Sequence, residues 1–170
     1  TLTDGGNGGK VVWSEGDTIG AIAVDGTVTE CAAVSINGSN ATFSVPADTK
    51  YAIYPYTTDY MYSANATSFG HRLAKEITLD GSNKVFGDNQ DVMVAPLTNN
   101  NLSFKHLCGY IEIKLMGTGT VKHIALRNNS HNWDALSGLG TIDFADANEP
   151  KIVTGTNHGT TFNFAYAKCA

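Results

Sequence analysis

The sequence predicts an all-β fold with little or no helix, and two observations lead to this prediction. First, apolar and polar residues alternate with a period of two in many short runs. One example is Ile111-Glu112-Ile113-Lys114-Leu115, a pattern typical of a strand with one buried face. Second, no stretch free of Gly, Pro, Asn and Asp is longer than residues 27–36. Because an average helix has about 11–12 residues, there is little room for helices.

Short apolar runs between turn signals define the expected strands. The turn signals include Asp25-Gly26, Asn37-Gly38 and Asn99-Asn100-Asn101. Residues 69–77 are the exception, since they could form one turn of helix. Many short strands with regular turns favour a β-sandwich. The predicted strands are 10–13, 18–23, 31–36, 42–45, 51–56, 74–79, 92–95, 102–104 with 107–115, 121–126, 140–144 and 160–166.

The apolar members of these runs form the expected core. The chain has 170 residues and 42% hydrophobic content, enough for the core of one domain. Residues 1–9 are expected to be a flexible leader or a hairpin tip, and residues 10–170 a single domain. Within it, residues 151–170 are either a closing strand or the start of a truncated second domain. The predicted core residues are Trp13, Ile22, Val34, Phe43, Ile53, Val92, Val94, Phe104, Ile111, Ile113, Ile124 and Ile142.

Charge and hydropathy exclude two classes of partner. The net charge is −5, the only arginines are Arg72 and Arg127, and no basic run occurs, so nucleic-acid binding lacks an electrostatic basis. The apolar runs are too short to span a bilayer. A chain that starts at Thr1 is expected to be a mature or trimmed form, from which a leader has been removed.

No motif in the sequence predicts catalysis, a cofactor or a metal. We find no Gly-x-Ser-x-Gly elbow, reactive-cysteine signature or phosphate loop, so we expect a protein that is not an enzyme. Cys31, Cys108 and Cys169 have no metal-ligand spacing, and we expect them to be reduced and mostly buried; one disulfide and one free thiol is the alternative. His106 and His123 would be neighbours if their strands paired as a hairpin, but a zinc site would need a third ligand.

Three aromatic features are candidates for recognition or assembly. Trp13 could stack on a sugar, although core packing is the simpler interpretation. Tyr60 and Tyr62 lie in a polar loop and are the better candidates for surface recognition. Near the C-terminus three aromatic residues alternate with Thr161, Asn163 and Ala165, which gives a strand with one aromatic face. This strand must either dock within the chain or enter a neighbour as a strand-exchange segment. Its aromatic residues are Phe162, Phe164 and Tyr166.

Five short motifs in order over residues 10–144 carry a family resemblance. They are Trp13 with Gly16-Asp17, Tyr51-Ala52-Ile53-Tyr54-Pro55-Tyr56, Asp91-Val92-Met93-Val94-Ala95, Leu102-Ser103-Phe104-Lys105-His106 with its partner Val121-Lys122-His123-Ile124, and Leu136-Ser137-Gly138-Leu139-Gly140. Together they resemble the fimbrillin family of Bacteroidetes, the Mfa-like and FimA-like surface and fimbrial proteins. The tail after Asp143 matches the family pattern poorly.

The resemblance implies a transthyretin-like Greek-key β-sandwich and a location at the cell surface or outer membrane, in a fimbrium. The implied function is that of a pilus subunit or fimbrillin-like lipoprotein in adhesion and assembly by β-strand addition. The implied partners are other fimbrial subunits or ligands on host or bacterial surfaces. Attachment to the membrane would need a lipid anchor that this chain does not contain. The alternative function is a surface glycan-binding module.

Overall fold

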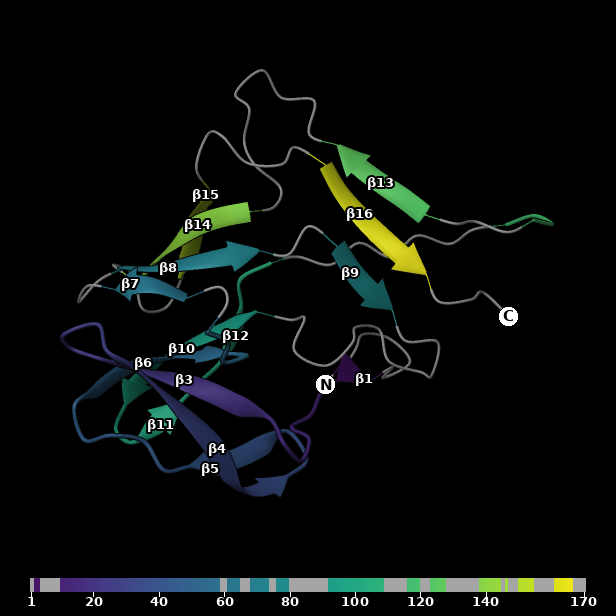
Figure 1. The fold of residues 1–170 in the computed structure, drawn as a ribbon. Helices are drawn as coiled ribbons and strands as arrows, with labels where there is room; N and C mark the ends of the chain where they lie inside the picture. The colour runs from purple at the N-terminus through teal and green to yellow at the C-terminus, as the bar shows by residue number, and fades with distance from the viewer. Residues whose placement is uncertain are drawn as a thin grey trace.

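The computed structural model describes an all-β protein (Figure 1), which confirms the predicted fold class at this level. It describes residues 2–3, 10–58, 61–64, 68–73, 76–79, 92–108, 116–119, 123–127, 138–144, 146, 150–154 and 161–166. None of these residues is helical. The strands are β1 (Leu2–Thr3), β2 (Lys10–Val11), β3 (Thr18–Ala23), β4 (Val28–Asn37), β5 (Asn40–Phe43), β6 (Thr49–Tyr54), β7 (Met61–Ala64), β8 (Ser68–Leu73), β9 (Glu76–Leu79), β10 (Met93–Thr98), β11 (Asn101–Leu102), β12 (Lys105–His106), β13 (His123–Arg127), β14 (Gly138–Asp143), β15 (Lys151–Thr154) and β16 (Thr161–Tyr166).

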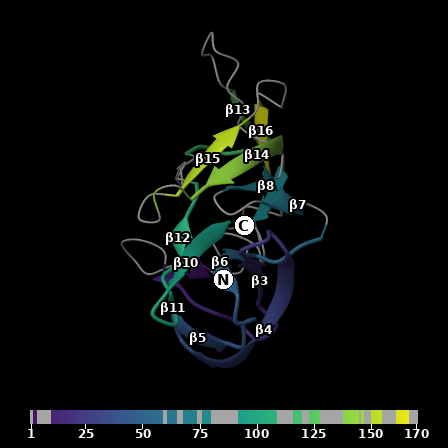
Figure 2. The ribbon, with the colours of Figure 1, turned by 90° about the vertical axis from the view of Figure 1, so that its left-hand side faces the viewer.

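The largest sheet has seven strands and is antiparallel and curled. Its order is β11-β10-β6-β3-β4-β5, and β12 also pairs with β10. Small residues meet across its centre, where Ala21 of β3 aligns with Ala52 of β6, and Ala52 aligns with Ala95 of β10. Figures 1 and 2 show β4 and β5 at one end of this sheet, away from the other sheets.

Two tight turns connect strands of this sheet as the sequence predicts. Thr98 pairs with Asn101, and the two residues between them, Asn99 and Asn100, have φ values of 51° and 59°. Positive φ at both central positions is the signature of a type I′ hairpin turn, which asparagine tolerates better than most residues. Gly38, with φ of 62°, opens the two-residue turn between β4 and β5.

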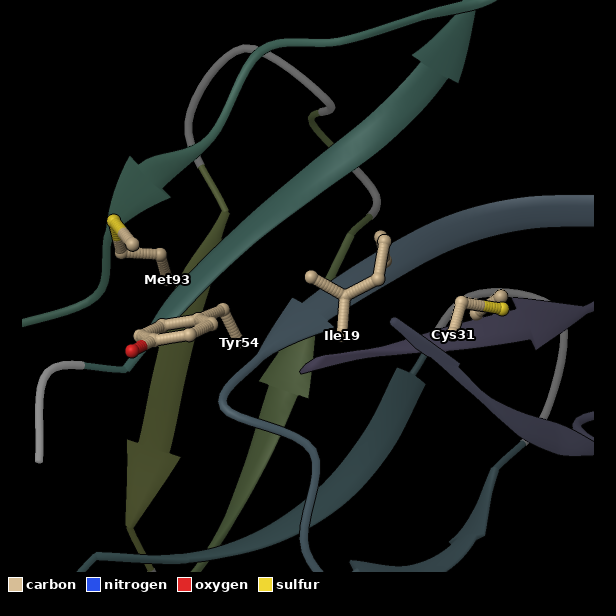
Figure 3. Packing of buried hydrophobic residues seen from close by; sticks show 6 residues of the cluster. Ile19, Cys31, Tyr54 and Met93 are labelled. Carbon is tan, nitrogen blue, oxygen red and sulfur yellow. The ribbon is translucent and has the colours of Figure 1, made fainter. Parts of the chain in front are cut away.

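Both faces of the central strands are buried, and each face contributes to its own apolar cluster. The first cluster, which we call the inner cluster, contains Ile19, Ala21, Cys31, Ala52, Tyr54 and Met93 (Figure 3). The second, which we call the outer cluster, contains Ile22, Ile53 and Val94 from the same strands, together with Ile142 of β14 and Phe144. Alternate residues of β3, β6 and β10 therefore point to opposite clusters, as strand geometry requires.

Strands β7, β8, β14 and β15 form an antiparallel four-stranded sheet of order β15-β14-β8-β7. Its strand β14 covers the outer cluster through Ile142, which is fully buried. Strands β13, β16 and β9 form a further sheet in that order. Short β1 and β2 pair antiparallel with each other.

The helical turn considered for residues 69–77 is wrong. The structure places β8 and β9 there, because each segment forms a ladder with a distant strand. Leu73 to Ser68 of β8 pair in register with Gly138 to Asp143 of β14, and β9 pairs with β16. Local sequence did not show these partners, and tertiary pairing overrides a weak local preference.

The described part of the strand predicted from residue 102 onward is interrupted. β11 ends at Leu102, Ser103 and Phe104 lie outside the strands, and β12 covers only Lys105–His106. Leu107 and Cys108 form a bend instead of opening a long strand, although the Leu107 N–H still donates to the Val92 carbonyl at 3.0 Å. The remainder of the predicted strand, residues 109–115, lies outside the described residues.

One predicted core residue is misplaced. Val34 is 69% exposed. The β4–β5 register shifts between Ala33 and Ser35, so Val34 lies at an irregularity near the end of the sheet. Ile22, Ile53, Val94 and Ile142 are buried as predicted, whereas Trp13, Phe43, Val92 and Phe104 are partly buried against the two clusters. The side chains of Ile111, Ile113 and Ile124 lie outside the described residues.

Candidate strand-addition site

Strand β16, which holds the predicted strand-exchange segment, lies in the middle of a sheet. On one side it pairs antiparallel with β13, where Phe164 aligns with Ile124 and Phe162 with Leu126. On the other side it pairs parallel with β9, where Phe164 aligns with Ile77 and Tyr166 with Leu79. In the structure, the C-terminal strand is thus docked within its own chain, and Figure 1 shows it between its two partners.

The register sorts the residues of this sheet into two kinds of row. One kind joins apolar residues across three strands, as in Ile124, Phe164 and Ile77. The rows between them carry polar residues, for example Arg127 aligned with Thr161. The register of the three strands therefore aligns their apolar positions with one another.

The three-stranded sheet depends on its central strand, β16. β9 and β13 both hydrogen-bond to β16, and neither pairs with the other in the described structure. Without β16, each of these two strands would present a row of unpaired N–H and C=O groups toward the gap between them. Such a gap can be filled only by an extended chain, because only an extended backbone satisfies two strand edges at once.

The motif Trp13-Ser14-Glu15-Gly16-Asp17 forms a turn closed by its own aspartate. The Asp17 N–H donates to the Ser14 carbonyl at 3.1 Å, and Gly16 has φ of 88°, which fits the third position of a type II turn. In return, the Ser14 N–H donates to Asp17 Oδ2 at 2.7 Å.

Asp17 also links this turn to β6, which sequence reasoning missed. The Tyr54 hydroxyl donates to Asp17 Oδ1 at 2.9 Å, and both residues are buried. A buried carboxylate needs donors to replace water, and this one has a backbone N–H and a phenol. The local signal was present, as an Asp just before an apolar strand and a Tyr in an apolar strand, but their contact spans 37 positions in the sequence.

Trp13 packs among aromatic rings in the inner cluster. Its ring lies edge-to-face with those of Phe43, Tyr54 and Phe104, at centroid distances of 5.1, 5.3 and 5.3 Å. The backbone N–H of Trp13 donates to the Gly38 carbonyl at 3.0 Å, so the motif is hydrogen-bonded to the β4–β5 turn. This arrangement favours the packing interpretation of Trp13 over sugar stacking.

The other candidate residues are dispersed. The predicted loop position of Tyr62 is wrong, because Tyr62 lies on β7 at the edge of the four-stranded sheet, while Tyr60 lies outside the described residues. His106 is on β12, which pairs with β10, and His123 is on β13, which pairs with β16, so the described ladders do not join them as a hairpin. Within the described part of the chain, no three His, Cys, Asp or Glu residues form a group that could hold a metal ion.

The cysteines differ in environment. Cys31 is a buried free thiol of the inner cluster, as predicted, and burial raises the pKa of this thiol. Cys108 is also outside any disulfide but is exposed, in the bend after β12. The prediction of burial is therefore wrong for Cys108, and Cys169 lies outside the described residues.

Comparisons with known proteins give no relative: no family model, curated protein or solved structure matches this chain. Among the described residues, no helix is long and apolar enough to cross a membrane.

Proposed function

We propose that this protein is a fimbrillin-type surface or pilus subunit that assembles by β-strand addition, with β16 as the exchanged strand. The observation that carries the proposal is the central position of β16 between β13 and β9. A strand near the C-terminus that completes a sheet in its own chain can complete the same sheet in a neighbour, because the same ladder hydrogen bonds and side-chain rows serve both arrangements.

The strand order of the large sheet supports the finer fold of the proposal. β3, β4 and β5 follow one another as antiparallel hairpins, and β6 returns beside β3, which gives the spatial order β6-β3-β4-β5. This is the order of a Greek key. Together with β14 packed over the outer cluster, it supports a Greek-key sandwich of the transthyretin-like kind.

The five sequence motifs support the family assignment, and the family would place the protein at the cell surface. The structure contains the Trp13 motif as a closed turn and residues 51–54 of the Tyr51 to Tyr56 motif in β6, where Tyr54 donates a hydrogen bond to Asp17. In this proposal both are parts of the folding scaffold, and the protein is not an enzyme. Its partners are further subunits and ligands at a host or bacterial surface.

Deleting residues 159–170 tests the role of β16. We expect the truncated protein to melt at a lower temperature or to self-associate, because β9 and β13 lose their shared partner. A synthetic peptide of residues 160–166 should restore the melting temperature of the parent. The matched control is the same peptide with Phe164→Asp, which places a charge in an apolar row and should not restore it.

Two outcomes would contradict the proposal. A truncated protein that stays monomeric with the melting temperature of the parent would show that β16 contributes no stability. Equal rescue by both peptides would show that the apolar rows do not determine which strand is bound. Polymer ladders from the native source on gels support the pilus subunit, whereas monomer that is retained on a polysaccharide would favour the glycan-binding module.

A further inference from the structure

The turn between β4 and β5 joins an asparagine directly to a glycine. Asn37 is the last residue of β4 and Gly38 is the first residue of the turn, and both are exposed, as is Ser39 after them. Gly38 has φ of 62°, and a Cβ placed on it would meet no atom within 4 Å. Solvent therefore reaches the junction between the Asn37 side chain and the Gly38 backbone.

An asparagine side chain can react with the backbone nitrogen of the residue that follows it. At this junction the Gly38 nitrogen gives up its proton to a base in solution and attacks Asn37 Cγ, which closes a succinimide ring. The bond from Cγ to the amide nitrogen breaks, and this nitrogen takes up a proton from water and leaves as ammonia. Water then opens the ring at either carbonyl, so asparagine and water become ammonia and either aspartate or isoaspartate.

The structure favours this reaction at Asn37. Glycine has no Cβ to obstruct the approach of its nitrogen, and its backbone dihedrals change at low cost as the ring closes. Among the described turn and loop bonds, Gly38 accepts one through its carbonyl, and its nitrogen donates none. Asn40 is also exposed in the same hairpin, but it precedes Ala41, whose Cβ crowds the attacking nitrogen. Asn40 is therefore a matched comparison within the same chain.

We propose that Asn37 is a site of spontaneous deamidation, with water as its co-reactant, and that the reaction alters the β4–β5 turn. Aspartate at position 37 is the first charge in residues 31–47, which are otherwise all uncharged. In isoaspartate the main chain runs through the former side chain and gains one carbon, at the position where Asn37 pairs with Asn40. The longer chain displaces the Gly38 carbonyl from the Trp13 N–H, to which it is bonded at 3.0 Å.

Incubation of the full chain in mildly alkaline buffer tests the proposal, because the attacking nitrogen must first lose its proton. Peptide mapping by mass spectrometry assigns the site, since Asn7-Gly8 is a second Asn-Gly pair in the sequence, outside the described residues. We expect Asn37 to be converted at least about tenfold faster than Asn40, which corresponds to a barrier lower by about 1.4 kcal/mol. In the isoaspartate fraction, the Trp13 amide should exchange with deuterium faster than in fresh protein, because it loses its acceptor.

Asn37→Gln is the matched variant, because its longer side chain would have to close a larger ring. It should stop the conversion at position 37 and keep the melting temperature, since this position is exposed. Equal conversion of Asn37 and Asn40 would overturn the proposal. So would an Asn37 that stays intact in the native protein but reacts in the urea-unfolded chain, because the folded turn would then block the attack. Unchanged exchange of the Trp13 amide in the isoaspartate fraction would overturn the proposed change in the turn. None of these measurements involves β16, so strand exchange and deamidation can fail independently.

Discussion

Removing the Tyr54 hydroxyl should destabilise the fold more than the loss of one oxygen atom suggests. Tyr54 and Asp17 are 2% and 5% exposed, and the hydroxyl lies 2.9 Å from Asp17 Oδ1. In Tyr54→Phe, the buried carboxylate keeps the Ser14 N–H but loses its phenol donor. Hydrogen bonds to charged groups contribute about 1.5–3 kcal/mol, so we expect a loss of that size in the free energy of unfolding.

For a chain of this length, such a loss lowers the melting temperature by roughly 3–12 °C. Urea and thermal unfolding followed by circular dichroism would measure it. Tyr51→Phe is the matched control, because Tyr51 stacks on Phe144 through its ring, at a centroid distance of 4.1 Å, and Phe keeps that ring. We expect the control to stay within about 0.5 kcal/mol of wild type. If the two variants lost equal stability, the Asp17–Tyr54 bond would not hold the motif to β6.

Three further predictions follow from burial. Val94→Ala should lower the free energy of unfolding by about 2–3 kcal/mol, because Val94 is fully buried in the outer cluster. Val34→Ala should change it by less than about 0.5 kcal/mol, because Val34 is exposed. Equal losses in the two variants would contradict the exposed position of Val34 on β4. Phe104→Ala should cost about 3 kcal/mol, the low end for a buried ring, because Phe104 is partly exposed beside Trp13; an unchanged melting temperature would contradict this. At neutral pH a thiol reagent should label Cys108 quickly and Cys31 slowly, since burial raises the Cys31 pKa and lowers its thiolate fraction; peptide mapping that finds Cys31 labelled first would refute it.

Alternation and turn chemistry predicted which segments are strands. The runs at residues 18–23, 92–95 and 160–166 overlap β3, β10 and β16, and the asparagine turn after β10 is where the sequence placed it. These signals are local, since they depend on side-chain period and on backbone dihedrals of a few residues. For that reason they can be recognised in a single sequence.

Partners were harder to predict than strands. Nothing local in residues 76–79 indicates a parallel ladder with β16, so the alternative of a helical turn stayed open there. Burial of both faces of a strand was also hard to predict. β3 reads Thr-Ile-Gly-Ala-Ile-Ala, and period-two reasoning selected Ile22 for the core but not Ile19, although both are fully or almost fully buried. A strand covered on both sides shows no alternation.

The candidate site was predicted in part, and the missing part was geometric. The alternation of Phe162, Phe164 and Tyr166 predicted a strand that must be paired, and the structure pairs it within the chain. Its central position could not be predicted, because it depends on β9 and β13 lying on either side. Likewise, the residues of the Asp17–Tyr54 contact were visible in the sequence, but their contact was not, since it requires the turn and β6 to meet.

The long stretch of sequence between β9 and β16 leads to a last prediction, on local stability. The ladder between Glu76 and Asn163 closes a long stretch of chain, and closing long loops carries an entropic cost before any contact forms. β3, by contrast, is joined to β4 by a short turn and is buried on both faces. We therefore expect the amides of β16 to exchange with deuterium through a smaller opening than those of β3, which should need global unfolding. Such a difference would let β16 leave its sheet for a neighbour while the large sheet stays folded. Equal protection of β16 and β3 in native-state hydrogen exchange would mean that the strand cannot be released separately, and exchange between subunits would then require unfolding of the whole protein.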